Sequence, residues 1–322
     1  MKIKWCILIL LIPIILTSCS TFSGFIGGGF GNFFGSSSDG TVGGRGVMLK
    51  FVDAPDNNAE FSEGIPFTIT IQVENNVVNE QGLNGRLCLK DGLSDSFGGI
   101  LDSDQCVPVS LPTASKVTNK INPSIDRYDF GPYSYRGLQK ELSLKTMITA
   151  DFSYEIDSIA GASACVKRKA AQSSTIPSNC GEKQNLQVQQ PDLPVKITSI
   201  SSRVASKSDS ESILLLDITL SNSHGGQVLS SGSALGATNN LPTTAEIDFD
   251  ITINQQPAIC EGVSRKRVEI RKNENQKVIK CRTDLLLNQD YLEAPIVIKM
   301  NYGYKQSIPG PTLILKKEDL IA

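Results

Sequence analysis

The feature that most constrains the fold is a two-residue alternation of apolar and polar side chains. Residues Phe67–Val73 alternate over seven positions, and the alternation stops at Glu74-Asn75-Asn76. Successive side chains of a strand point to opposite faces of a sheet, so this period indicates half-buried strands. Segments with a helical period are few and short. The sequence therefore predicts an all-β fold.

Two strand patterns occur twice along the chain. Phe67–Val73 corresponds to Ile213–Leu220, and Ile148–Tyr154 corresponds to Ile298–Tyr304. Asn75 precedes Tyr154 by 79 residues, and Asn222 precedes Tyr304 by 82 residues. Because both signatures keep nearly the same separation, the chain is expected to hold two related β-modules.

The boundary between the modules is predicted at Gln189–Pro194, where two prolines restrict the backbone. A chain of 322 residues, less a leader of 18, is about the length of two domains. We expect the first module to span residues 47–190 and the second to span residues 195–322, placed end to end.

The first 18 residues have the pattern of a secretory signal. Lys2 and Lys4 precede an apolar run of about a dozen residues, which is too short to span a bilayer. The tetrad Leu16-Thr17-Ser18-Cys19 resembles the prokaryotic lipobox, which implies that Cys19 receives a diacylglycerol and becomes the first residue. The alternative is a plain secretory signal with an incidental cysteine. We expect an exported protein, membrane-anchored through lipid and facing the extracytoplasmic side.

Residues 19–46 are expected to form a lipid-anchored flexible tether. Residues 20–46 hold ten glycines and many serines, a composition that disfavours helix. Five of the chain's twelve phenylalanines also fall between Phe22 and Phe34. Aromatic rings beside a lipid anchor are able to settle at the headgroup boundary, so interfacial contact is the alternative to a plain spacer.

Tandem secreted modules behind a lipobox, with extended strands that close on Asn and a Gly-containing turn, resemble the Ig-like adhesion-type modules of bacterial and archaeal envelope proteins. The resemblance implies two tandem Ig-like β-sandwich modules over residues 47–322 and carries no functional residues. Antibody-type Ig domains match poorly, because their core Trp is missing and Trp5 lies in the leader.

Six cysteines remain after Cys6 leaves with the leader and Cys19 is assigned to lipid. An even number in an exported chain suits three disulfides, and six cysteines allow fifteen connectivities. Local pairing is the simplest connectivity: Cys88 with Cys106, Cys165 with Cys180, and Cys260 with Cys281. Zinc ligation is disfavoured, because the chain has no CxxC motif and one histidine.

No catalytic motif emerges, and no cofactor or metal is predicted. The only histidine, His224, lies among serines in Ser221–Gly226, which we interpret as a strand-ending turn rather than a catalytic triad. Four aspartates of the first cysteine loop offer oxygen ligands for calcium: Asp91, Asp95, Asp102 and Asp104. Their spacing does not match an EF-hand, so a solvated turn is favoured and calcium binding stays open.

Tyr128, Tyr133 and Tyr135 cluster with two arginines around a Gly-Pro pair. Rings and arginines on a loop are typical of contact surfaces, so these tyrosines are candidate partner contacts, and packing over a sandwich end is the alternative. The basic runs Lys167–Lys169 and Arg265–Arg267 are interpreted as solvated faces. Contact with anionic headgroups or envelope polymers is a minor alternative for both runs.

The charge balance argues against nucleic acid as a partner, because 31 basic and 33 acidic residues leave a net charge of −2. We expect a non-enzymatic, lipid-anchored cell-envelope protein that binds or scaffolds an envelope protein or polymer. One alternative is an accessory subunit of an envelope secretion or appendage complex. The other is a secreted hydrolase that uses carboxylates, whose pairing in space is invisible in sequence.

Overall fold

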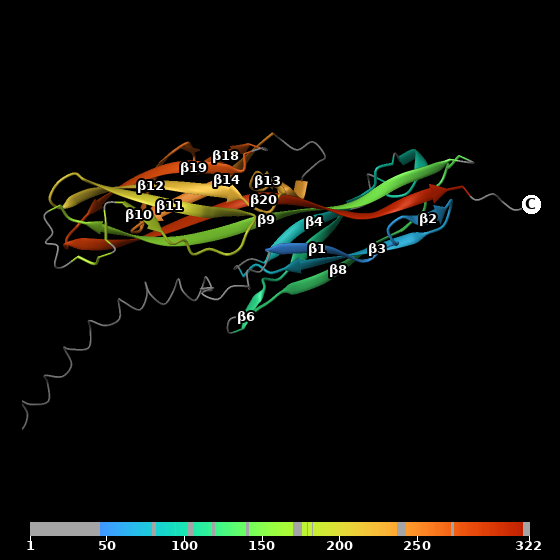
Figure 1. The fold of residues 1–322 in the computed structure, drawn as a ribbon, viewed down its shortest axis with the longest axis horizontal. Coiled ribbons are helices and arrows are strands. Elements are labelled where there is room, and N and C mark those ends of the chain that lie inside the picture. Colours follow the sequence, from blue (N-terminus) through green and yellow to red (C-terminus); the bar gives the residue numbers. More distant parts are fainter. Residues whose placement is uncertain are drawn as a thin grey trace, which may run out of the picture. The chain divides into compact units, whose positions relative to one another are not determined.

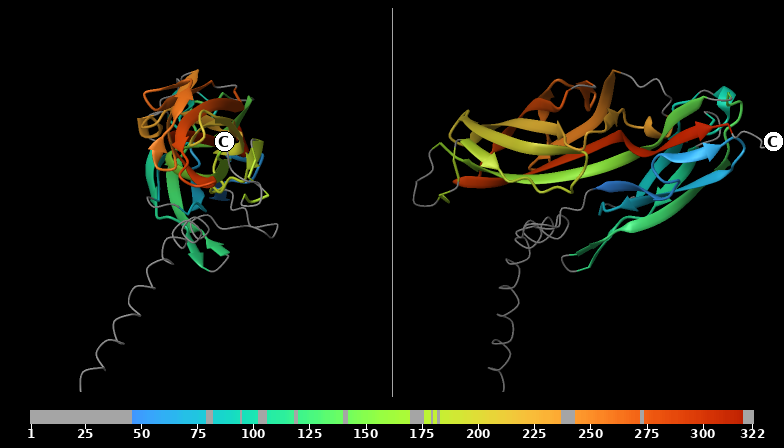
Figure 2. Two further views of the ribbon diagram at one scale, coloured as in Figure 1. Left: turned by 90° about the vertical axis from the view of Figure 1, so that its left-hand side faces the viewer. Right: turned by 45° about the vertical axis from the view of Figure 1, so that its right-hand side comes forward.

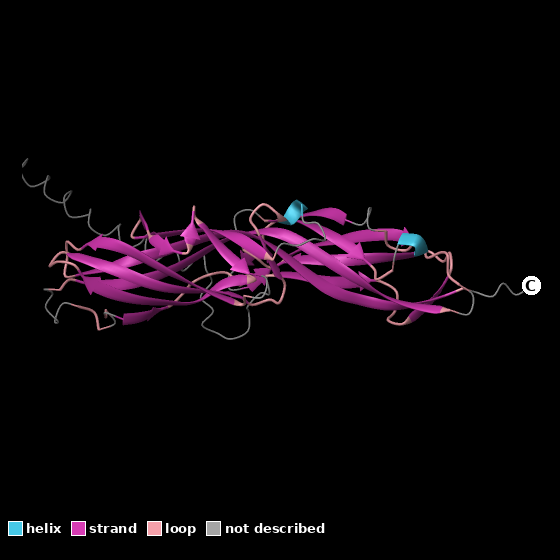
Figure 3. Cartoon of the chain, turned by 90° about the horizontal axis from the view of Figure 1, so that it is seen from above, coloured by secondary structure: helices cyan, strands magenta, loops and turns pink. Residues whose placement is uncertain are grey.

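The computed structural model describes residues 46–317, with gaps at 79–81, 94, 102–105, 118–119, 140–141, 170–175, 179, 182, 237–242 and 272–273. The regular secondary structure of the described residues consists of strands and two 3₁₀ turns, η1 (Asp95–Phe97) and η3 (Ala234–Gly236), joined by loops (Figure 3). The predicted all-β class is confirmed. The predicted signal peptide and the predicted tether, with Cys19, lie outside the described residues except for Gly46.

The first half of the chain forms two facing layers. One layer has the order β1-β3-β8, built from β1 (Val47–Asp53), β3 (Phe67–Asn75) and β8 (Ser124–Tyr133). The other layer has the order β9-β4-β5, built from β9 (Ser143–Lys167), β4 (Leu83–Lys90) and β5 (Cys106–Leu111). Alternate residues of β3, among them Ile69, Ile71 and Val73, are fully buried, as the alternation predicts. The layers pack as a β-sandwich.

The second half repeats this strand order. A five-stranded layer runs β10-β11-β12-β19-β16, from β10 (Lys183–Leu186), β11 (Val195–Ser206), β12 (Glu211–Asn222), β19 (Gln276–Leu286) and β16 (Ile259–Glu261). The facing layer runs β20-β14-β18-β17, from β20 (Tyr291–Lys316), β14 (Thr244–Ile253), β18 (Arg267–Arg271) and β17 (Val263–Ser264). The order β11-β12-β19 against β20-β14-β18 matches β1-β3-β8 against β9-β4-β5.

Strands β9 and β20 join the facing layers of both halves into one ten-stranded sheet. They pair antiparallel over 24 residue pairs, from Tyr291↔Lys167 to Lys316↔Ser143 (Figures 1 and 2). The second repeated segments meet here, because Tyr154 lies opposite Tyr304. The C-terminal part of β20 therefore lies among strands of the first half, where it also pairs in parallel with β2 (Ala59–Ser62).

A bulge adapts β20 to its second set of neighbours. The register shifts between Pro309 and Thr312, which changes the parity of the buried side chains from Tyr302 and Tyr304 to Leu313 and Leu315. The remaining strands are short: β6 (Ser115–Val117), β7 (Lys120–Asn122), β13 (Gln227–Leu229) and β15 (Gln256–Pro257). One continuous hydrophobic cluster contains buried residues from both halves.

The predicted connector Gln189–Pro194 is packed against β9, one strand of the long β9–β20 pair, which is called the ladder below. Gln189 and Gly161 exchange two backbone hydrogen bonds of 2.8 Å, and the Gln190 side chain bonds both backbone groups of Ile197. The ranges 47–190 and 195–322 share one sheet, so they are not separate in their hydrogen bonding. The division of the chain into two related modules with these bounds stays a prediction.

The three disulfides confirm the predicted local pairing. Cys88–Cys106 ties β4 to β5, and Cys260–Cys281 ties β16 to β19, both between directly opposed residues. Cys165–Cys180 ties the end of β9 to the segment before β10. Disulfides persist in oxidising compartments, so the folded chain has the chemistry of an exported protein.

The shared sheet predicts that a core change near the C-terminus unfolds the first half. Leu313 is fully buried opposite Thr146, so Leu313→Ala should lower the free energy of unfolding by about 2–5 kcal/mol. Native-state hydrogen exchange should accelerate in the N-terminal part of β9. Ile298→Ala, a buried change elsewhere in β20, should instead accelerate exchange around β14. Unchanged exchange of β9 in Leu313→Ala would contradict the shared sheet.

Candidate functional site

The predicted tyrosine contact loop is largely internal, and the prediction for Tyr135 is corrected. Tyr135 is 1% exposed, and its ring stacks on Phe67 with centroids 5.7 Å apart. Tyr133 is half-buried and packs on the same ring at 5.9 Å. Tyr128 is half-buried as well, and burial together with Asp126 raises its pKa to about 12. A ring that is buried in the core is not available to a partner, so Tyr135 is withdrawn as a partner contact. Tyr128 and Tyr133 lie on β8 rather than on a loop, and their contact with a partner stays a prediction.

The tyrosine loop and the aspartate loop are tied together. The Tyr135 hydroxyl donates to Asp91 Oδ2 at 2.9 Å, and Asp91 also accepts the backbone N–H groups of Leu93 and Ile100. Burial, and then the Asp91 charge, raise the pKa of Tyr135 above its ordinary value. Asp91 is thus committed to fixing two loops. Asp102 and Asp104 lie outside the described residues, as does the side chain of Asp95.

Removal of this hydroxyl should destabilise the fold. Tyr135→Phe keeps the ring on Phe67 but removes the only side-chain hydroxyl among the three donors described for Asp91, so the free energy of unfolding should fall by about 1–2 kcal/mol. Denaturant unfolding measures the change. Tyr291→Phe, at a half-buried position, is the control and should change stability by less than about 0.5 kcal/mol. Unaltered stability of Tyr135→Phe would show that this hydrogen bond contributes nothing.

His224 lies in the turn between β12 and β13, as the sequence predicts. Its Nε2 atom lies 3.7 Å from Asp192 Oδ1, and Asp192 also pairs with Lys196 at 3.3 Å. The neighbouring Ser223 hydroxyl donates to the Pro194 carbonyl at 3.2 Å. These contacts hold the turn against the connector between the halves. The serine and the histidine therefore serve the turn rather than each other.

A buried ion cluster was missed by sequence reasoning. Asp151, on β9, is 5% exposed, and its Oδ2 atom lies 2.6 Å from Lys90 Nζ and 3.0 Å from Lys305 Nζ. The Ser307 hydroxyl donates to Asp151 Oδ1 at 2.5 Å. Burial acts to raise the pKa of Asp151, but hydrogen bonds from Lys90, Ser307 and Lys305 outweigh it and hold the pKa below its ordinary value. Asp151 occupies a polar position of the alternating segment Ile148–Tyr154, so the sequence contains no signal that its carboxylate would be buried.

Loss of the Asp151 charge should destabilise the sheet and change its response to acid. Asp151→Asn leaves Lys305 poorly paired, at a cost of about 3 kcal/mol. The folded-state pKa lies below the unfolded value of about 3.9, so the carboxylate contributes fully above that pH and its contribution is lost as pH falls through the folded-state pKa. Unfolding of Asp151→Asn, measured at several pH values, should lack this acid loss.

The exposed pair of Lys266 and Asp250 supplies the control for this experiment. Their side chains are separated by 3.1 Å but lie 72% and 41% exposed. Solvent screens such a pair, so Asp250→Asn should leave stability and its acid dependence nearly unchanged. Equal effects of the two substitutions would contradict a special role for the buried cluster.

Two tyrosines of β20 fasten the second half to the ladder. The Tyr302 hydroxyl donates to the Val195 carbonyl at 3.3 Å and accepts the Val195 N–H at 3.1 Å. The Tyr304 hydroxyl donates to Asn222 Oδ1 at 3.2 Å and accepts the Gly226 N–H at 2.7 Å. Burial raises the pKa of Tyr304 to about 12, so both hydroxyls stay neutral and act as structural donors.

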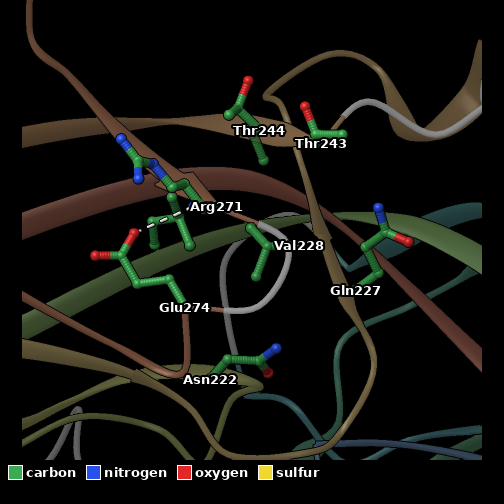
Figure 4. A pocket seen from close by; sticks show the side chains of 9 residues that line it. Asn222, Gln227, Val228, Thr243, Thr244, Arg271 and Glu274 are labelled. Atoms are coloured by element: carbon green, nitrogen blue, oxygen red, sulfur yellow. Dashed lines mark hydrogen bonds between the residues drawn. The ribbon is translucent and has the colours of Figure 1, made fainter.

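A shallow depression lies beside the His224 turn. Its volume is about 250 Å³ including the open solvent at its mouth, and it is bordered by β12, β13, β14 and β18 (Figure 4). The residues that line it are Asn222, Gln227, Val228, Thr243, Thr244, Ala245, Ile270, Arg271 and Glu274. Glu274 accepts the Arg271 N–H at 3.2 Å, so its carboxylate is tied to the rim. The lining contains one carboxylate and no pair of converging acids.

The described residues contain no group of three or more His, Cys, Asp or Glu side chains arranged to hold a metal ion. The basic run Arg265–Arg267 turns between two strands and meets acids on β14. Lys266 pairs with Asp250 at 3.1 Å, and Arg267 pairs with Glu246 at 2.9 Å and Asp248 at 3.2 Å. These exposed pairs form a mixed-charge face, as expected of a solvated surface.

Comparison with known proteins identifies no family. No protein-family model matches the chain, and no curated protein matches it. Among solved structures, a serine-rich repeat adhesion glycoprotein from Streptococcus agalactiae is similar at 11% identity over 85% of this chain and 96% of that chain, with a TM-score of 0.15. A similarity of this size does not establish a shared fold or function. Within the described ranges, no helix is long and apolar enough to cross a bilayer.

Proposed function

We propose that this chain is a non-enzymatic, lipid-anchored envelope protein whose Ig-like β-sandwiches bind or scaffold another surface component. The observation that carries the proposal is the ladder of β9 and β20, which joins both halves into one sheet. One shared sheet makes the folded part stiff, and a tether would hold it away from the membrane. Its exposed strands would then be accessible to a partner. The partner proposed is an envelope protein or polymer.

The junction between tether and body supports this arrangement. Gly46 is buried, and its carbonyl accepts the Asn76 N–H at 2.8 Å. A Cβ atom at Gly46 would lie 2.9 Å from the Asp192 carbonyl oxygen, so the backbone passes close to the connector. Gly46, the last residue of the predicted tether, is therefore fixed against the folded strands.

The chemistry of the described side chains favours binding over catalysis. General acid–base catalysis near neutral pH most often uses histidine, and His224 is engaged with Asp192 in a turn. The most buried carboxylate, Asp151, is neutralised by two lysines. These groups stabilise strands and turns, so the proposed activity resides in the surface of the sheets.

The proposed anchor is tested by Cys19→Ser in the full chain. The wild-type protein should remain with membranes and show, by intact mass, an acylated Cys19 as its first residue. Cys19→Ser should be released from membranes, because a weak residual contact between the protein and lipid does not replace two acyl chains. Cys6→Ser is the matched control and should stay anchored. Retention of Cys19→Ser on membranes would contradict the anchor.

The proposed binding role is tested by cross-linking in intact membranes. The wild-type chain should yield a cross-linked partner that Cys19→Ser loses, because release from the membrane removes the high local concentration. The absence of any cross-linked component would contradict binding. A hydrolytic activity that is lost on replacing a carboxylate would contradict the non-enzymatic assignment.

A further inference from the structure

The hairpin of β6 and β7 forms a two-stranded sheet separate from the layers of the sandwich. Figure 1 shows it, labelled β6, extending away from the strands of the first half. Ser115 lies opposite Asn122, and Val117 lies opposite Lys120. The described side chains of β6 and β7 are exposed or half-buried, so this ribbon contributes little to the core.

The hairpin has an unusual charge for this chain. Residues Pro112–Pro123 contain Lys116 and Lys120 and no acidic residue, although the whole chain has 33 Asp and Glu. Both lysines are exposed, and Val117 is 56% exposed. The register places Lys116 opposite Ile121 and Val117 opposite Lys120, so each face of the ribbon carries one aliphatic side chain beside one lysine.

The base of the hairpin lies beside the point where the tether joins the body. The Ala114 N–H donates to the Val77 carbonyl at 3.0 Å, and Asn75 Nδ2 donates to the Pro112 carbonyl at 2.9 Å. The next residue of the same turn, Asn76, bonds Gly46. One turn, Asn75–Val77, therefore contacts both the hairpin base and the end of the tether.

We infer that the hairpin is a membrane-contacting prong, with Lys116 and Lys120 on anionic phospholipid headgroups and Val117 at the headgroup boundary. This inference rests on the proposed lipid anchor. An acylated Cys19 would precede Gly46 by 27 residues, so the length of chain between them limits how far the hairpin can move from the bilayer. At such a local concentration, a weak contact suffices to orient the body.

The chemistry favours lipid over a protein partner. Lysine is depleted at the centres of protein interfaces, and one exposed valine is too small an anchor for one. A lysine near an anionic membrane, in contrast, strengthens binding about fivefold without requiring a matched pocket. Each face of the ribbon pairs one lysine with one aliphatic side chain, Lys120 with Val117 and Lys116 with Ile121, which is the composition of an interfacial contact.

The test uses tryptophan as a reporter in the full lipid-anchored chain. The only natural tryptophan, Trp5, lies in the leader, so Val117→Trp gives a processed protein with a single Trp. The protein is placed on vesicles of phosphatidylcholine and phosphatidylglycerol with brominated acyl chains. Val117→Trp emission should shift to the blue and be quenched. Val278→Trp, at a 55% exposed valine of β19, is the matched control and should show neither effect.

Charge removal tests the headgroup contact. Lys116→Gln with Lys120→Gln should weaken the contact of the Val117→Trp hairpin about 30-fold, measured as loss of quenching. High salt should act in the same direction, because it screens the lysines. Quenching that persists in the double variant would contradict the role of the lysines.

The outcomes separate this inference from the proposed anchor. Sedimentation with vesicles of phosphatidylcholine alone reports the anchor, and a chain that stays in solution contradicts both proposals. The chain could also sediment but show equal quenching at positions 117 and 278, or none at 117. Either result would keep the proposed anchor and contradict membrane contact by the hairpin.

Discussion

The pairing of β9 with β20 is the constraint on which the rest of the structure depends. These strands are 25 and 26 residues long, whereas strands of globular proteins are usually about 5–6 residues. Each strand is long enough to serve in both halves. Strands β4 and β5 build outward from β9, and β14 and β18 build outward from β20. If this ladder were lost, both sandwiches would lose a wall.

The ladder also places its polar groups where they fasten neighbouring elements. Asp151 faces away from the core with the neighbouring Ser153, yet both are buried. Lysines from β4 and β20 close over Asp151, so one carboxylate ties three adjacent strands. Farther along, Glu155 accepts the N–H groups of Gly232 and Ala234 and holds η3 beside the ladder. Asp151 and Glu155 are thus each satisfied by strands or loops from other parts of the chain.

The structure separates side chains that hold the fold together from a segment that lies outside it. Tyr135, His224 and Asp151 make structural contacts, whereas the β6–β7 hairpin lies outside both sandwiches and near Gly46. The three disulfides hold an edge strand, a second edge strand and the end of β9. Disulfides persist in oxidising compartments, so a framework stabilised in this way suits an exported protein.

Local chemistry was readable from the sequence alone. The period of two predicted strands such as β3 and β12, and three cysteine pairs only 15, 18 and 21 residues apart predicted the disulfides. The pairing of Tyr154 with Tyr304 and of Asp151 with Lys305 was decided by the tertiary structure. So was the burial of Tyr135 on Phe67. Alternation records which face of a strand is apolar, but it does not record which distant strand or ring will cover that face.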